Sequence, residues 1–186
     1  MDVIEAIHSR SSIGKVLQDP VDRALIEELI EAAIQAPNHR VTEPWRFFVV
    51  SGEARQDLGE LMERVLLQSK PNASDEERAR ERAKPLRAPV LIIVTSASGK
   101  DQIETTENFA ATAAAVENLL LAAHAREMGA QWRTGPVAYA PETKQWLAVP
   151  DDTAIVACVY LGYPNMEPKP RRRTQAREKT VWVAGV

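Results

Sequence analysis

The apolar positions of this chain recur in two patterns, which together predict alternating helices and strands. Apolar side chains three and four residues apart indicate an amphipathic helix, whereas a short unbroken apolar run between turn residues indicates a buried strand. The first pattern predicts a short N-terminal helix around Val3–Ile7 and further helices over 20–36, 53–68, 74–84, 103–128 and 141–147. The second pattern predicts strands over 46–50, 90–95, 130–134 and 153–161.

Local signals predict where two of these helices begin and end. Asp19 followed by Pro20 matches an N-cap acid with proline in the first turn, so the second helix is expected to begin there and to end before Pro37. Gly129 is expected to close the long helix as its C′ residue. The small side chains of 110–115 let another backbone approach closely, which fits either a core helix or a helix at a subunit interface.

Helices and strands alternate, but the connections between them differ greatly in length. The first strand is not followed by a G-x-G-x-x-G turn, which argues against a dinucleotide-binding Rossmann fold. We expect an α+β protein with one domain over 1–186: a three-layer α/β/α sandwich with helices on both sides of a mixed central sheet. Residues 163–186 contain a basic run and few apolar side chains, so this C-terminal extension is expected to wrap over its own domain or a partner subunit.

Composition narrows the class of protein. The 186 residues are 45% hydrophobic and 26% charged, which is ordinary for a globular domain, and the net charge of −3 argues against nucleic acid as a partner. The one cysteine, Cys158, leaves no internal disulfide and fits a reducing compartment. Acidic residues interrupt the N-terminal apolar run, and the stretch 109–125 is too short and too polar for a membrane span. We therefore expect a cytoplasmic protein with no membrane partner.

Three polar segments lie at the ends of predicted elements, where binding sites usually form. In the first, Arg10 precedes Ser11 and Ser12 just after the N-terminal helix. A guanidinium with two neighbouring hydroxyls suits a phosphate group, because arginine forms a charge-assisted clamp and serine adds donors. The alternative is a helix end with a favourable cation and ordinary turn hydroxyls.

The second and third polar segments each combine an indole with charged side chains. Residues 38–45 place His39 and Glu43 in a loop ahead of a strand, and this loop either lines a pocket or lies on the surface. Arg133, Thr134 and Gly135 follow a predicted strand. A guanidinium beside a glycine that permits close backbone approach suits a flat anionic or electron-rich ring. A strand end with a solvated arginine is the alternative.

Other arrangements of reactive side chains are weaker. The three histidines have no metal-ligand spacing among themselves or with Cys158, so no metal site is expected. No Ser-His-Asp or G-x-S-x-G arrangement supports a hydrolase, and no side chain is expected to act as a nucleophile.

Taken together, the three segments resemble the nitroreductase family, and more closely its branch of small single-domain NAD(P)H nitroreductases. The resemblance covers nearly the whole chain. Its motifs, in order, are Arg10-Ser11-Ser12, Ala36-Pro37-Asn38-His39, Glu43-Pro44-Trp45, Arg87-Ala88-Pro89, Trp132-Arg133-Thr134-Gly135 and Tyr160-Leu161-Gly162.

The resemblance implies a homodimer that binds FMN at its interface, with both subunits contributing to each site. The implied cofactor contacts are Arg10, Ser11 and Ser12 at the phosphate and flavin edge, His39 and Glu43 from the partner subunit, and Arg133, Thr134 and Gly135 beside the isoalloxazine. The chain departs from the family at Ser11, where a second arginine is common, and at Gly14, where a further basic residue is common. Lys15 or the arginines of 171–173 are expected to supply the missing charge.

The resemblance also implies a reaction. NADH or NADPH gives hydride to flavin N5, and a small oxidised acceptor such as a nitroaromatic or a quinone then takes its place and is reduced, which predicts ping-pong kinetics. The choice between the two nicotinamides and the physiological acceptor stay open. The alternatives are a flavin-binding protein without nicotinamide turnover and an interaction protein that has lost the cofactor.

Overall fold

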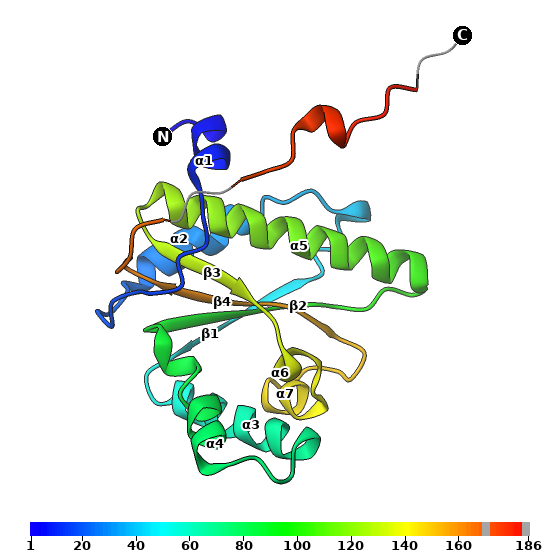
Figure 1. Ribbon diagram of the computed structural model, residues 1–186. Coiled ribbons are helices and arrows are strands. Elements are labelled where there is room, and N and C mark those ends of the chain that lie inside the picture. Colours follow the sequence, from blue (N-terminus) through cyan, green and yellow to red (C-terminus); the bar gives the residue numbers. More distant parts are fainter. Residues whose placement is uncertain (169–171, 184–186) are drawn as a thin grey trace.

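The computed structural model describes residues 1–168 and 172–183. Within these residues, one sheet of four strands lies between two layers of helices (Figure 1). The strands are β1 Trp45–Ser51, β2 Val90–Ser96, β3 Gly129–Arg133 and β4 Ala154–Gly162. The helices are α1 Val3–Ser9, α2 Arg23–Ala33, α3 Ala54–Ser69, α4 Asp75–Arg82, α5 Gln102–Ala125, α6 Pro136–Tyr139 and α7 Pro141–Trp146, with short 3₁₀ turns at His39–Val41, Pro85–Arg87 and Ala176–Glu178.

The sheet has the strand order β1-β2-β4-β3, and its three pairings are all antiparallel. The α+β class and the three layers are confirmed, but the expected mixed sheet is wrong for the described residues. The cause is the place of β4. The long helix α5 joins β2 to β3, which run in the same direction, and β4 lies between them and runs opposite to both. The alternation along the sequence therefore reflects a parallel crossover whose two strands never pair with each other.

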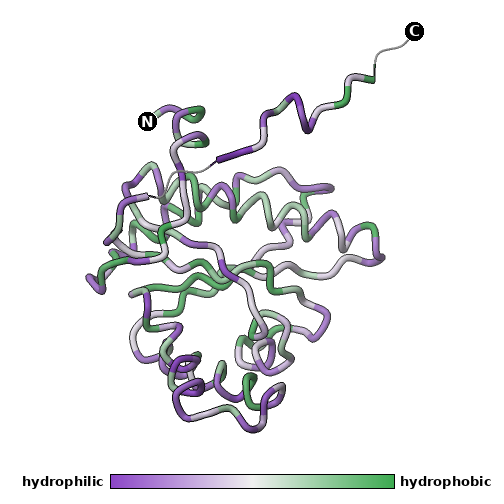
Figure 2. Tube along the Cα trace, viewed as in Figure 1, coloured by the Kyte–Doolittle hydropathy of each residue, from purple (hydrophilic) through white to green (hydrophobic). Residues whose placement is uncertain are grey.

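Helices cover both faces of the sheet: α2 and α5 lie on one face, and α3, α4, α6 and α7 lie on the other (Figure 1). The strand β2 is buried along its whole length for this reason, and its side chains alternate between two apolar clusters. Ile92 and Val94 join the cluster that contains α2 and α5 residues, whereas Leu91 and Ile93 join the one that contains α3 residues. Figure 2 shows apolar residues gathered in the strands and hydrophilic ones in the outer helix α4.

The second helix begins later than the sequence signals predict. Asp22, not Asp19, is its N-cap, and the Asp22 carboxylate accepts a hydrogen bond from the backbone N–H of Ala24 at 3.1 Å. Both aspartates satisfy the N-cap preference, so residue type alone does not choose between them. Val21 packs against the core ahead of the helix, and Pro20 therefore belongs to the approach to the helix rather than to its first turn.

The long helix α5 ends before Gly129, so the expected C′ position of this glycine is wrong. The helix ends at Ala125, and Glu127 adopts a left-handed conformation with φ of 57°. Gly129 instead opens β3, where a Cβ atom would lie 2.8 Å from the Ile13 side chain and 2.9 Å from that of Val16. The glycine is needed because the N-terminal segment passes closely over β3.

The C-terminal segment lies away from the sheet and from both helical layers. In Figure 1 residues 172–183 extend outward from the molecule. Lys169 and Arg171, part of the expected basic run, lie outside the described residues. Three apolar side chains near the end of the segment are 85%, 86% and 95% exposed: Val181, Trp182 and Val183.

Candidate functional site

The segment after α1 runs along the edge strand β3, which places the first polar segment of the sequence beside the third. The backbone N–H of Ile13 donates to the carbonyl of Ala130 at 3.0 Å, and Val16 forms an isolated bridge with Pro164. These contacts border a pocket of about 620 Å³ that is lined by Ser12, Gly14, Lys15, Gln131, Met166 and Glu167. Three segments far apart in the sequence thus form one wall of a pocket of ligand size.

Arg10 and Ser11 supply further polar groups at this segment. The Arg10 side chain is 16% exposed, and its Nε donates to Glu117 Oε1 on α5 at 3.2 Å. The Ser11 hydroxyl is buried and has no hydrogen-bond partner among the described residues. A buried hydroxyl without a partner is unfavourable, and a ligand oxygen would remove that penalty. The segment therefore fits an anionic group.

Arg133 is held by neutral groups. Its Nε and Nη2 donate to the side-chain oxygen of Gln131 at 3.0 and 2.7 Å, and its guanidinium carbon lies 5.1 Å from the centre of the Tyr160 ring. No carboxylate in the described part of the chain forms an ion pair with Arg133. The positive charge is therefore oriented without being neutralised.

Burial changes the acidity of two side chains on β4. It raises the pKa of Cys158 to about 12 and, as the largest of several influences, raises the pKa of Tyr160 to about 12. Both groups are therefore neutral at ordinary pH. The thiol is unsuited to act as a nucleophile, and the ring against Arg133 is an uncharged phenol.

Thr134 faces a different pocket from the one beside Ser12. It lines a hollow of about 530 Å³ that also contains three aromatic side chains, Phe109, Trp132 and Tyr139. Gly135 precedes α6 with a φ of 150°, a conformation that favours glycine. Within one chain, Thr134 therefore lines a different pocket from Ser12, so the predicted site residues Arg133, Thr134 and Gly135 do not all face the pocket beside the N-terminal segment.

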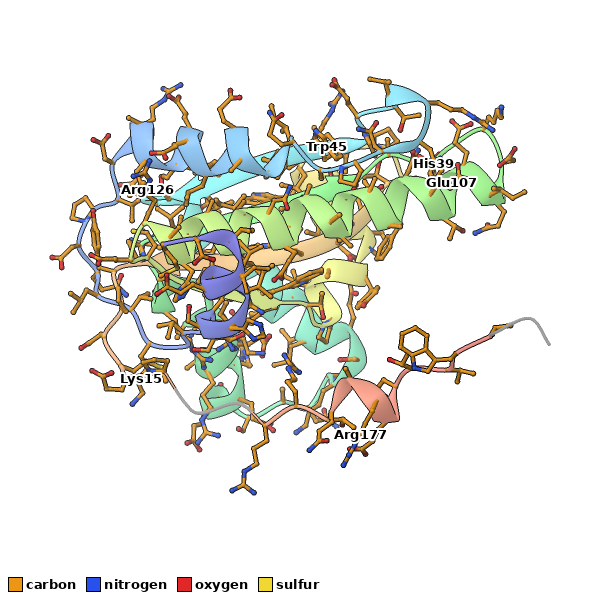
Figure 3. The ribbon with its side chains drawn as sticks, turned by 90° about the horizontal axis from the view of Figure 1, so that it is seen from above. Lys15, His39, Trp45, Glu107, Arg126 and Arg177 are labelled. Carbon is orange, nitrogen blue, oxygen red and sulfur yellow. The ribbon has the colours of Figure 1, made fainter. Side chains whose placement is uncertain are left out.

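The loop that carries His39 and Glu43 lies against the N-terminal half of α5. His39 lines a groove of about 470 Å³ together with Glu107, Ala110 and Ala114. Figure 3 shows His39 next to Glu107. The small side chains of α5 predicted to permit a close approach thus form the floor of this groove.

The backbone of the same loop is strained. Arg40, Val41 and Glu43 have φ values of 54°, 53° and 43°, which residues with a side chain rarely adopt. The side-chain oxygen of Asn38 accepts a hydrogen bond from the backbone N–H of Glu43 at 3.0 Å and helps to hold the turn. Strain gathered in one loop is typical of a binding segment.

The predicted site residues fall into two groups that lie apart within one chain. Arg10 contacts α5 at Glu117, whereas His39 lies near Glu107. Ten residues of an α-helix span about 15 Å along its axis. Figure 3 shows Lys15 and His39 on opposite sides of the view. The separation agrees with the expectation that His39 and Glu43 serve the site of a partner subunit, which stays a prediction.

Three residues around Arg10 and Arg133 were not among those predicted: Glu117, Gln131 and Tyr160. Gln131 and Arg133 are two positions apart on a predicted strand and therefore share a face, which is a usable signal. The pairing of Gln131 with Tyr160 across the sheet depends on strand register. The register between strands that are distant in the sequence cannot be predicted from the local pattern of residues.

Among residues 1–168 and 172–183, no three His, Cys, Asp or Glu side chains are grouped so as to hold a metal ion. No helix in the same residues is long and apolar enough to cross a membrane. A pocket of about 700 Å³ between α2 and β1, lined by Ile26, Val49 and Arg55 among others, contains none of the predicted site residues.

An antiparallel sheet between two helical layers, with an arginine-serine segment beside its edge strand, defines an α+β sandwich with a candidate anion site. The chain belongs to the nitroreductase family: the sequence model described as "Nitroreductase family" matches residues 7–163.

Individual relatives agree with this assignment. The chain is 34% identical over 176 residues to "Putative NAD(P)H nitroreductase YfhC" of Bacillus subtilis, in an alignment that covers 94% of this chain and 91% of the relative. The crystal structure of a nitroreductase-like family protein from Bacillus cereus has a TM-score of 0.88 at 28% identity, and the match covers 100% of this chain and 97% of that one. The structure of a "putative nitroreductase in complex with fmn" from Desulfovibrio desulfuricans has a TM-score of 0.73 at 26% identity and covers 96% and 95% of the two chains.

Proposed function

We propose that this chain is an FMN-dependent oxidoreductase that transfers hydride from NADH or NADPH to a small oxidised acceptor such as a nitroaromatic or a quinone. The observation that carries the proposal is the arrangement of polar groups at the β3 edge. Arg10 lies beside the buried Ser11 hydroxyl, which lacks a partner among the described residues, and Arg133 is held without a neutralising acid. Membership of the family and the FMN complex of a similar protein support it.

The side chains after α1 fit the phosphate of FMN. The hydrogen bond from Arg10 to Glu117 uses Nε, so the two Nη groups can donate to phosphate oxygens. The Ser11 hydroxyl gains the partner that it otherwise lacks. Ser12 and Lys15 line the adjoining pocket and add a hydroxyl and a second positive charge. These groups would hold the phosphate in place of the second arginine that is common in the family.

Arg133 fits the electron-rich edge of the flavin ring. When bound, the flavin supplies the hydride chemistry through its N5. The guanidinium, which Gln131 and Tyr160 already orient, would stabilise negative charge on the reduced ring without having to reorganise. Thr134 and Gly135 follow Arg133 directly, and their backbone N–H groups are candidates to donate to the ring edge.

The proposed reaction uses no side chain as a nucleophile. The only thiol of the chain, Cys158, is buried, and its pKa is raised to about 12 by that burial. The side chains bind and orient, and donor and acceptor occupy the same position in turn. Ping-pong kinetics follow, because the nicotinamide product must leave before the acceptor can enter.

A homodimer is part of the proposal, since His39 and Glu43 lie away from Arg10 in one chain. The groove beside His39 is floored by Ala110 and Ala114, which would let a second copy approach closely. The same helix also exposes Ile103 (71%) and Phe109 (45%). We expect residues 163–186 to wrap the partner subunit, because residues 172–183 of this extension lie away from the sheet and helices of their own chain.

Absorbance spectroscopy of the purified chain tests the proposal. The protein is expected to be yellow, to lose its flavin absorption with NADH or NADPH under anaerobic conditions, and to regain it when a quinone is added. A yellow protein that neither nicotinamide bleaches is a flavin-binding protein without turnover. A colourless protein that takes up no added FMN refutes the proposal, and steady-state kinetics that require a ternary complex refute the ping-pong order.

A further inference from the structure

Two neutral side chains fix the position of Arg133. Gln131 Oε1 accepts two hydrogen bonds from the guanidinium, at 3.0 Å from Nε and 2.7 Å from Nη2. Tyr160 is 7% exposed and presents its ring 5.1 Å from the guanidinium carbon. Gln131 and Tyr160 are directly paired in the β3–β4 register, and Arg133 is two residues along the same face. One strand register therefore places both supports against the arginine.

The two arginines of the candidate site are held in different ways. Arg10 donates to a carboxylate, that of Glu117, so part of its charge is already balanced. Arg133 is held by an amide oxygen and an aromatic ring. Such partners orient a guanidinium through hydrogen bonds and the ring quadrupole, but neither carries a negative charge. The charge of Arg133 is therefore left to act on a ligand.

We propose that Gln131 and Tyr160 are positioning residues that hold Arg133 toward the flavin and, through it, raise both the affinity for FMN and the reduction potential of the bound flavin. This inference rests on the proposed function. The flavin becomes more negative as it is reduced, so an ordered positive charge beside it favours the reduced form more than the oxidised one. Tyr160, which is 7% exposed, need not touch the flavin to act in this way, whereas Gln131 also lines the pocket beside Ser12.

Gly14 is part of the same arrangement. A Cβ atom at this position would lie 3.1 Å from Gln131 Oε1, the atom that accepts both hydrogen bonds from Arg133. A side chain at position 14 would therefore require the Gln131 amide to shift slightly, and the close approach places the segment after α1 directly against this positioning residue.

The experiment measures the dissociation constant of FMN and its reduction potential in the dimeric holoprotein. Tyr160→Leu removes the ring and is expected to weaken binding about tenfold, which equals about 1.4 kcal/mol, and to lower the potential. Gln131→Glu keeps an acceptor of the same shape but places a negative charge on Arg133, and it is expected to lower the potential as well. Tyr160→Phe keeps the ring and is expected to restore both values.

A double-mutant comparison separates positioning from folding. In an Arg133→Ala background, Tyr160→Leu is expected to cause no further loss of FMN affinity, because its effect passes through the arginine. An equal loss in both backgrounds overturns the inference, as do wild-type affinity and potential in both Tyr160→Leu and Gln131→Glu. If Tyr160→Leu does not fold, Gln131→Leu takes its place, because it removes the acceptor of both Arg133 hydrogen bonds without adding a charge; wild-type affinity and potential in Gln131→Leu overturn the inference. A wild-type protein that binds no FMN overturns the proposed function and this inference together, whereas unaltered variants of a flavin-binding wild type overturn only the inference.

Discussion

Arg10 Nε lies 3.2 Å from Glu117 Oε1, and this ion pair ties the segment after α1 to the middle of α5. A second polar contact, between the Ser9 hydroxyl and His124 Nε2 at 2.7 Å, lies one residue earlier, at the last residue of α1. The apolar side chains of α1 contribute less, since Val3 and Ile4 are 66% and 60% exposed. Polar contacts therefore place the arginine that we expect to bind phosphate.

The first prediction concerns the charge of this ion pair. Glu117→Gln keeps an oxygen that accepts from Arg10 but removes a negative charge close to the proposed phosphate, so it is expected to tighten FMN binding about threefold. Glu117→Leu removes the acceptor as well and is expected to give a smaller gain or a loss. Fluorescence titration with FMN measures both. Weaker binding by Glu117→Gln than by the wild type would show that the ion pair assists the site rather than competing with it.

The second prediction concerns the support of α4. The Glu63 side chain on α3 is 10% exposed and accepts from Arg78 Nε at 2.7 Å, and Arg82 Nε lies 3.3 Å away. Glu63→Ala leaves two arginines without this partner and is expected to lower the free energy of unfolding by about 2 kcal/mol, less than for a fully buried pair because both arginines are partly exposed. Urea denaturation measures the loss. Glu76→Ala, which breaks an exposed pair with Arg80, is the control and is expected to change stability by less than about 0.5 kcal/mol.

The third prediction concerns the strained loop beside His39. Val41 has a φ of 53° and is 77% exposed, so its β-branched side chain is strained and buries little apolar surface. Val41→Asn is expected to raise the free energy of unfolding by about 1 kcal/mol, because asparagine tolerates the left-handed conformation. Val49→Asn in the strand β1 has no such strain to relieve and is expected to lower stability. Chemical denaturation of both variants checks this, and a loss of stability in Val41→Asn would contradict the assignment of strain.

Most elements could be predicted from the sequence because they depend on local patterns. The unbroken apolar run over 90–95 became β2, and the helical spacing over 53–68 became α3. The strand order could not be predicted, since the insertion of β4 between β2 and β3 is a contact between distant segments. The start of α2 shows the same limit on a smaller scale. Asp19 and Asp22 are both suitable N-caps, and the structure uses Asp22 while Val21 packs against the core ahead of the helix.

The candidate site was predictable to a similar degree. Polar segments at the ends of elements singled out Arg10, Arg133 and His39; the chemistry of the Arg10 segment suits a phosphate and that of the Arg133 segment a flat ring, and these roles stay predictions. Their neighbours were not predictable, because the contact of Arg10 with Glu117 depends on how α1 meets α5, and that of Arg133 with Tyr160 depends on strand register. Spacing along the chain carries neither kind of information.

The fourth prediction concerns the dimer. Ala110 lies in the groove beside His39 and is exposed in the single chain. Ala110→Glu is expected to convert a dimer into a monomer and to abolish tight FMN binding, since a buried charge without a partner opposes association. Light scattering and flavin content of the purified protein measure the two effects. Ala24→Glu adds the same charge at an exposed position of α2 and is expected to leave both unchanged; a dimeric, yellow Ala110→Glu protein would place the interface elsewhere.

The fifth prediction concerns stability at high pH. Burial raises the pKa of Cys158 from 9.0 to about 12, so the thiol ionises from about pH 9 in the unfolded chain but stays neutral in the folded protein. Unfolding then releases a proton, and the free energy of unfolding is expected to fall by about 1.4 kcal/mol per pH unit from this group as pH rises above 9. Tyr160 adds a similar slope above pH 10, because its pKa is also raised, from 10.0 to about 12. The Cys158→Ala variant lacks only the loss of unfolding free energy that begins near pH 9, and it keeps the loss due to Tyr160. Urea unfolding of both proteins at pH 7, 8 and 10 should show the same difference in free energy of unfolding at pH 7 and 8 and a shift of this difference in favour of the variant at pH 10. Parallel losses in the two proteins would show that the folded thiol ionises as readily as the unfolded one.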